Sequence, residues 1–155
     1  MGKSPYQEAL GAAMRGRLVL VAGVGAIIRD SQGWVLLERR SDNGEWDIPA
    51  GAVDPGETPR EAITREVREE TGLEVRVRGI AGVFGGNRYR HTYEDGQRVE
   101  GFTVVFDCEA VGGTLGSRDG EATRFEYHSV QTLPKLMAPY PRSLFEPSRN
   151  APIIE

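Results

Sequence analysis

One segment in the middle of the chain constrains the fold most, because it specifies a helix with both ends marked. Thr58 can cap the helix N-terminus, Pro59 suits the first helical position, and Glu61 completes a capping box with Thr58. Gly72 is a natural cap for the C-terminus. The sequence therefore predicts a helix over residues 59–71.

This helix carries a group of acidic residues with a definite spacing. Each helical residue advances by roughly 100°, so Glu66, Glu69 and Glu70 fall within an arc of about 100° on one side. Ile63 and Val67 occupy the adjoining arc, which we expect to pack on a sheet. Three crowded carboxylates repel one another, and a divalent cation relieves that repulsion. The alternative is a solvated acidic helix face, which is what most charge runs form.

The residues around the helix start fit a cation site. Gly51 permits a close approach of the backbone, and the carbonyl of Ala50 would then point at the metal. Glu57 and Arg65 are placed to pair with each other and dock the preceding loop on the helix. Arg65 would also screen the carboxylates.

The full pattern over residues 51–73 is G-x5-E-x7-R-E-V-x-E-E-x-G-L. Its chance occurrence in a chain of this composition is on the order of one in a few hundred thousand. It resembles the Nudix box at every fixed position. The stretches 39–51, 93–96 and 119–121 also resemble segments of bacterial Nudix enzymes, so the similarity extends over nearly the whole chain. Ala50 departs from the pattern, since many members have Gly there.

The resemblance implies an α/β fold, a Nudix-type α/β/α sandwich with a mixed central sheet. It also implies attack of water at phosphorus, with Glu66, Glu69 and Glu70 holding Mg²⁺ or Mn²⁺. Family members differ in the glutamate that acts as the base, so Glu66, Glu69 and Glu121 are all candidates for catalysis. Glu121 lies on the expected loop before a late strand, where a solvated carboxylate is the alternative interpretation.

Residues that select the substrate are less clearly marked. The candidates for substrate binding are Arg39, Arg40, Trp46, Arg88 and Tyr89. The two arginines at 39 and 40 end a strand, and Arg88 and Tyr89 begin a basic and aromatic cluster that continues to Tyr93. The alternatives are a solvated strand end, a packed tryptophan and the face of an exposed hairpin.

The implied function is hydrolysis of a diphosphate linkage in a nucleoside-diphosphate-linked substrate, of the ADP-ribose or sugar-nucleotide type. One alternative is a sanitising pyrophosphohydrolase for modified nucleoside triphosphates. Another is a non-catalytic nucleotide-sensing module, against which the intact box argues. A plain acidic domain that binds Mg²⁺ or Ca²⁺ for structural reasons is a further alternative.

The chain of 155 residues fits a single domain, with an N-terminal extension over 1–16 and a proline-rich, irregular tail over 139–155. A net charge of −4 argues against charge-driven binding to nucleic acid or anionic membranes. We expect a small phosphorylated nucleotide as the partner, a cytoplasmic location and, by analogy, a homodimer. The lone cysteine, Cys108, is expected to be a buried, inert thiol.

The remaining pattern predicts further elements. Apolar runs predict strands at 18–29, 34–39, 73–84, 99–110 and 124–130, with another at 89–93. Short helices are expected at 5–14 and 131–137, and residues 41–57 are expected to form a loop.

Overall fold

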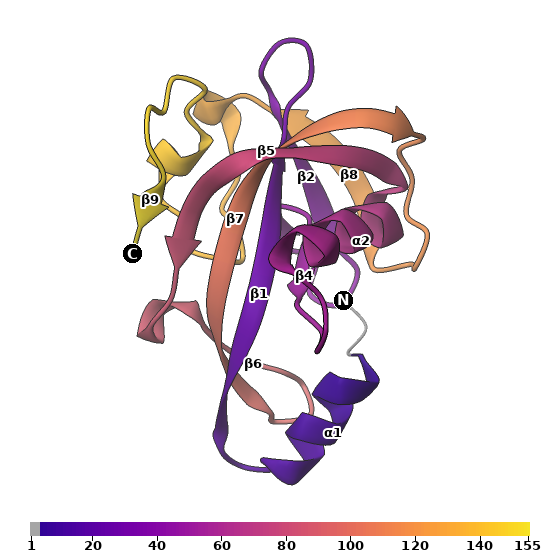
Figure 1. The fold of residues 1–155 in the computed structure, drawn as a ribbon, viewed down its shortest axis with the longest axis vertical. Helices are drawn as coiled ribbons and strands as arrows, with labels where there is room; N and C mark the ends of the chain where they lie inside the picture. Colours follow the sequence, from indigo (N-terminus) through magenta and orange to yellow (C-terminus); the bar gives the residue numbers. More distant parts are fainter. Residues whose placement is uncertain (1–3) are drawn as a thin grey trace.

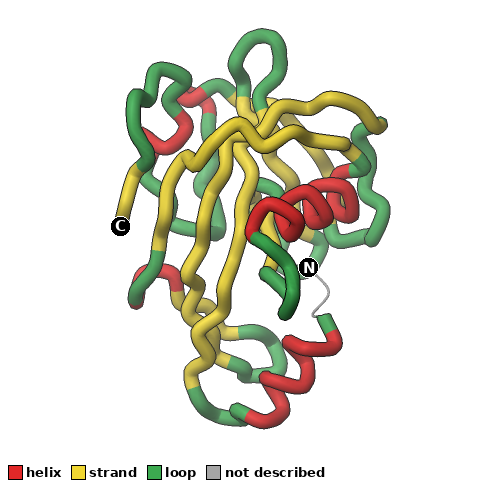
Figure 2. The backbone as a smooth tube through the Cα atoms, viewed as in Figure 1, coloured by secondary structure: helices red, strands yellow, loops and turns green. Residues whose placement is uncertain are grey.

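The computed structural model describes residues 4–155, so the first three residues of the expected N-terminal extension lie outside it. The chain folds as a mixed α/β protein, in which strands occupy the centre and α2 lies against them (Figures 1 and 2). Helix α1 lies below α2, beside the lower end of β1 (Figure 1). No helix in the described residues is long and apolar enough to cross a membrane.

The larger sheet runs in the order β4-β1-β7-β5-β9, with β6 paired to β7. Its strands are β1 (Leu18–Ile28), β4 (Ala50–Ala52), β5 (Leu73–Phe84), β6 (Arg90–Thr92), β7 (Arg98–Gly113) and β9 (Ile153–Ile154). Strand β1 pairs in parallel with β7 and antiparallel with β4, whereas β5 and β7 are antiparallel. The sheet is therefore mixed, which confirms the predicted fold class.

A smaller antiparallel sheet stands beside the first and runs in the order β3-β2-β8. It contains β2 (Val35–Arg40), β3 (Trp46–Asp47) and β8 (Ala122–His128). Strands β1 and β2 are consecutive in the chain, and a turn at Asp30–Gly33 joins them, with Gly33 at a φ of 80°.

Helix α2 (Pro59–Thr71) has the predicted bounds and caps. The Thr58 hydroxyl accepts the N–H of Glu61 at 3.2 Å, and the Glu61 carboxylate accepts the N–H of Thr58 at 2.8 Å. Gly72 ends the helix with a φ of 75°, a left-handed conformation that favours glycine. These caps fix where the helix begins and ends. They therefore also fix which of its residues face the sheet and where its candidate catalytic carboxylates lie.

Two apolar cores hold the layers together. One joins α2 to the larger sheet and includes Ile63 and Val67, both fully buried. The other lies on the opposite face of that sheet and includes Phe84 and Phe145. Cys108 is buried in the first core, where burial raises its pKa to about 12 and disfavours the reactive thiolate.

Three sequence-based expectations were wrong in detail. The expected loop at 41–57 contains β3 and β4, because short strands without an apolar run give little sequence signal. The helix expected at 131–137 is only the 3-10 turn η2 (Val130–Thr132), since Pro134 has no N–H to continue it. The tail is not irregular throughout, because it forms the 3-10 turn η3 (Arg142–Phe145) and β9.

Helix α1 (Pro5–Ala13) is shorter by one residue than expected. Ser4 caps it, and the Gln7 side chain accepts the N–H of Ser4 at 3.1 Å, which completes a capping box. No side chain of α1 is fully buried, so packing against the rest of the protein contributes little to its stability.

Candidate active site

Arg65 is the centre of an ion-pair network at the start of α2. Its Nε and Nη2 atoms donate to the two carboxylate oxygens of Glu57, at 2.6 and 2.9 Å. Nη2 also donates to the carbonyl of Ala52 at 3.1 Å. Arg65 thus ties the loop before α2 to the helix, and its hydrogen bonds lower the pKa of Glu57 to about 2.

The same guanidinium reaches two of the acidic candidates on the helix. Its Nη1 atom lies 2.8 Å from Glu66 Oε1 and 3.4 Å from Glu69 Oε2. Burial is the largest influence on Glu66 and raises its pKa, while Arg65 opposes that change. Glu69 is more exposed than Glu66, with 53% of its side chain accessible against 7%.

Gly51 lies directly against the Glu66 carboxylate. A Cβ atom built on Gly51 would lie 2.0 Å from the carboxyl carbon of Glu66, so any larger residue at this position would displace that carboxylate. Gly51 therefore lets strand β4 approach the acidic face of α2.

Glu70 is almost fully buried, with 1% exposure. Its Oε2 accepts the N–H of Ala50 at 3.0 Å. Its Oε1 is buried without a hydrogen-bond partner in the described structure. Burial, followed by the nearby carboxylates of Glu38 and Glu66, raises the pKa of Glu70 well above its ordinary value.

The carboxylates fit a hard divalent cation. Oxygen ligands suit Mg²⁺ and Mn²⁺, and the buried, unpartnered Glu70 oxygen is an atom that a cation would satisfy. Within residues 4–155, no three His, Cys, Asp or Glu side chains already converge in a ligand arrangement. Arg65 engages Glu66 and Glu69 instead, so these two side chains must reorient for a cation to bind.

Glu121 lies near the helix carboxylates although it is distant in sequence. It lines a cleft of about 310 Å³ together with Glu66, Glu69 and Arg65. Asp54 and Asp119 complete the acidic lining, and we call this space the acidic cleft. The structure thus brings together the three predicted catalytic candidates, whereas Glu70, a predicted metal ligand, is buried and is not among the described residues that line this cleft.

Three of the predicted substrate-binding residues line a second cleft, of about 200 Å³. Arg40, Arg88 and Tyr89 face this space beside the backbone of Ala50 and Gly51, and we call it the arginine cleft. Arg90 and His91 add to its lining, so the basic and aromatic cluster faces a cavity. Burial raises the pKa of Tyr89 to about 12, and its hydroxyl donates to Glu155 Oε2 at 3.5 Å.

The other two candidates are directed elsewhere. Arg39 donates from Nε to the Gly44 carbonyl at 3.0 Å and stays in its own hairpin. Trp46 packs edge-on against His128, with ring centroids 5.7 Å apart. Neither residue is among the described residues that line the arginine cleft.

Sequence reasoning missed two buried acidic residues beside the site. Glu38 and Asp47 are direct partners in the pairing of β2 with β3, and they are 2% and 5% exposed. Burial raises the pKa of Glu38 to about 8 and that of Asp47 to about 7. A charged residue that follows the apolar run 35–37 was an available signal for Glu38, whereas Asp47 lay in the expected loop.

A comparison with protein families also identifies the part of the chain that contains α2 and its preceding loop. The family model described as the NUDIX domain matches residues 19–146. The chain belongs to the Nudix hydrolase family. The matched region contains the lining of the arginine cleft and, except for Ser4 and Gln7, that of the acidic cleft.

Three curated relatives carry different substrate names. An "ADP-ribose pyrophosphatase" of Methanocaldococcus jannaschii is 34% identical over 75% of this chain and 65% of its own length. A "Putative 8-oxo-dGTP diphosphatase" of Bacillus subtilis is 32% identical over 76% of this chain and 72% of its own. An "RNA pyrophosphohydrolase" of Bradyrhizobium is 31% identical over 79% and 86%. The chain therefore spans slightly less than two thirds of the first of these relatives.

The fold has close counterparts among solved structures. The crystal structure of a MutT protein from Methanosarcina mazei Go1 has a TM-score of 0.65 and 31% sequence identity, and the match covers 82% of this Nudix chain and 91% of that one. This similarity agrees with the mixed α/β architecture described above.

Proposed function

We propose that this Nudix protein hydrolyses a diphosphate linkage in a nucleoside-diphosphate-linked substrate, with ADP-ribose or a sugar nucleotide as the first candidate. The observation that carries the proposal is the position of the two clefts on either side of β4. The acidic cleft offers Glu66 and Glu69, and the arginine cleft offers Arg40 and Arg88. Ala52 lines both clefts, so they meet at β4, which supports a substrate that extends from one to the other.

Each part of the site has a distinct role in this proposal. Glu66, Glu69 and Glu70 would hold Mg²⁺ or Mn²⁺, with the Ala50 carbonyl as a further ligand. The cation supplies charge stabilisation at the phosphoryl oxygens and activates the attacking water. The ion pair of Arg65 with Glu57 holds the preceding loop against the helix, and Gly51 leaves room for the Glu66 carboxylate.

The arginine cleft would bind the second half of the substrate. Arginine side chains suit phosphate and hydroxyl groups through their several donors. The relative named ADP-ribose pyrophosphatase supports a nucleoside diphosphate joined to a sugar. The relative named 8-oxo-dGTP diphosphatase supports the second candidate, a modified nucleoside triphosphate.

The general base is assigned to one of three carboxylates. All three line the acidic cleft, where Glu66 is buried, Glu121 is half-buried and Glu69 is exposed. Glu69→Gln and Glu121→Gln variants separate these roles through their pH–rate profiles. The rate of the wild type should fall at low pH, where the base is protonated. If only one variant lacks this fall, the residue replaced in it is the base.

Product analysis tests the proposal. The protein is incubated with Mg²⁺ or Mn²⁺ and ADP-ribose, sugar nucleotides, dinucleoside polyphosphates, 8-oxo-dGTP and 5′-triphosphorylated RNA. Formation of AMP and ribose 5-phosphate from ADP-ribose is the expected result. A nucleoside monophosphate with pyrophosphate, formed only from 8-oxo-dGTP, would favour the second candidate, and metal-dependent cleavage of none would overturn both.

A further inference from the structure

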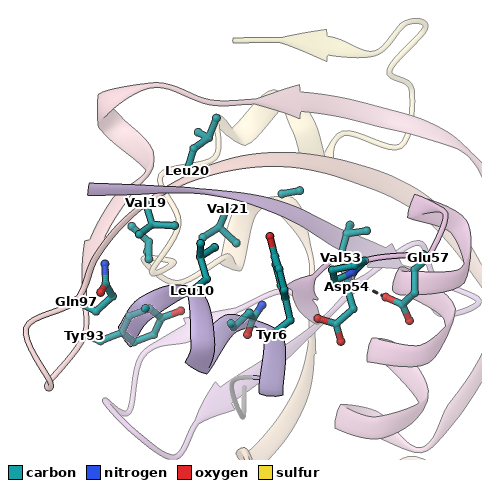
Figure 3. Close-up of a pocket in the computed structure, with 16 residues that line it drawn as sticks. Tyr6, Leu10, Val19, Leu20, Val21, Val53, Asp54, Glu57, Tyr93 and Gln97 are labelled. Atoms are coloured by element: carbon teal, nitrogen blue, oxygen red, sulfur yellow. Dashed lines mark hydrogen bonds between the residues drawn. The ribbon is translucent and has the colours of Figure 1, made fainter. Parts of the chain in front are cut away.

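A third cavity lies between α1 and the strand β1, outside the two clefts already described. It has a volume of about 400 Å³, and we call it the α1 groove (Figure 3). Its walls are largely apolar and come from the helix, the strand, the loop before α2 and the β6–β7 turn. The side chains that form them include Tyr6, Leu10, Val19, Val21, Val53 and Tyr93.

Strand alternation aims the apolar side chains of β1 into this groove. Successive residues of a strand point to opposite faces of the sheet. Val19 is 6% exposed and Val21 is half-buried, and both point toward α1 in Figure 3. Leu20 lies between them, points to the other side of the strand and is 66% exposed. The groove therefore has an apolar wall formed by β1, and α1 covers it from one side.

The groove is joined to the candidate active site by the N-terminus of α1. The Ser4 hydroxyl donates to Asp54 Oδ1, and the Asp54 N–H donates to Glu57 Oε2 at 3.0 Å. Glu57 is the partner of Arg65, which contacts the carboxylates of α2. Asp54 lines both the α1 groove and the acidic cleft, so the two spaces adjoin.

The groove also adjoins the arginine cleft. Val21, Tyr93 and Val99 line both spaces. The acidic cleft, where the diphosphate would be cut, and the arginine cleft thus both adjoin the apolar α1 groove. Such an arrangement suits a substrate with two chemically different ends.

We propose that the α1 groove binds the planar base of the substrate's nucleoside, while the arginine cleft binds the more polar group beyond the diphosphate. This inference rests on the proposed function, and it specifies a substrate that carries a heterocyclic base. The walls combine valines with the rings of Tyr6 and Tyr93, and flat aromatic side chains suit stacking on a base. The volume lies within the range of small-molecule sites.

The polar groups of the groove are few and stand at its edges. The Gln97 amide is oriented by donation from Nε2 to the carbonyls of Arg17 and Arg98, at 3.1 and 3.0 Å. Its Oε1 is then the atom of that amide available to accept from a ligand. An apolar pocket with a few placed polar groups is the usual composition of a site for a heterocycle.

The helical wall lies outside the part of the chain that the family model matches. Residues 4–14 form the cap and helix α1, and they lie before the region 19–146 that matches the family model. The groove consequently adds a binding surface to the shared site rather than repeating it.

Binding of two fragments tests the groove directly. AMP carries a base, whereas ribose 5-phosphate has the same sugar phosphate without one. We expect AMP, but not ribose 5-phosphate, to shift the NMR signals of the Leu10 and Val19 methyl groups. Leu10→Trp, which fills the groove, should weaken AMP binding by about ten-fold. Ala9→Trp, on the exposed side of the same helix, should leave the affinity unchanged.

A second variant guards against distortion by the larger side chain. Tyr6→Ala removes one wall without overfilling the groove and should also weaken AMP binding. Unchanged affinity in both groove variants, or methyl shifts confined to the arginine cleft, would overturn the inference. Because fragment binding needs no turnover, its failure is distinguishable from failure of the hydrolase assignment. If the protein hydrolyses ADP-ribose but AMP does not shift the Leu10 methyl signals, the proposed function stands and the proposed base site in the groove is wrong.

Discussion

Arg65 holds Glu57 through two hydrogen bonds, from Nε at 2.6 Å and from Nη2 at 2.9 Å. A lysine at this position keeps the charge but cannot make both bonds together with those to Glu66 and the Ala52 carbonyl. We expect Arg65→Lys to fold normally and to lose about ten-fold or more in kcat/KM. Steady-state kinetics and circular dichroism check this, and an Arg65→Lys protein with full activity would contradict the proposed role of the network.

Gly51 offers a test of the close contact between β4 and α2. Gly51→Ala would place a methyl group within 2.0 Å of the Glu66 carboxyl carbon, so the carboxylate must move. We expect a lower melting temperature and a lower metal-dependent turnover. Gly79→Ala is the matched control, because a Cβ there meets no atom within 4 Å. Equal melting temperatures and activities for the two variants would show that the contact does not matter.

Asp47 should make stability depend on pH. Burial raises its pKa from 3.8 to about 7, so between these values the folded protein binds more protons than the unfolded chain. The free energy of unfolding therefore falls as pH rises through this window, by an amount on the order of a few kcal/mol. Asp47→Asn removes this contribution. Urea unfolding of both proteins from pH 4 to 8 should show the wild type losing stability relative to the variant, and parallel profiles would refute the assignment.

The C-terminal segment should contribute to global stability. Phe145 is 1% exposed and packs in the core on the far face of the larger sheet. Phe145→Ala should cost about 3–5 kcal/mol. Phe102→Ala is a control of the same chemistry at a site that is 51% exposed, and its effect should be much smaller. Denaturant unfolding compares them, and similar losses would mean that the tail is not part of the core.

Local signals explain why α2 was predictable to the residue. Thr58, Glu61 and Gly72 satisfy the ends of the helix through contacts within a few residues of the chain. The fixed spacing of Glu66, Glu69 and Glu70 follows from the helix itself. The positions of β3, β4 and β9 depend instead on pairing with strands distant in sequence, which short segments do not encode locally.

The same distinction applies to the site. The partnership of Glu57 with Arg65 could be inferred from one loop and two helical turns. The burial of Glu38 and Asp47 arises from the pairing of two strands and from packing around them, so composition alone did not reveal it. The α1 groove likewise requires a helix and a strand to be placed side by side, and the sequence of either element alone does not predict it.

The central claim is that the carboxylates of α2 carry metal-dependent hydrolysis, and Glu70→Gln tests it most directly. The measurement is ADP-ribose cleavage as a function of Mg²⁺ concentration, for the wild type and the variant, with thermal unfolding of each recorded without metal. We expect the variant to lose at least about a hundred-fold in turnover. It should unfold at the same or a higher temperature, because an amide replaces a buried carboxylate whose ionisation is unfavourable. A folded variant that cleaves ADP-ribose with the wild type's rate and metal dependence would contradict the claim.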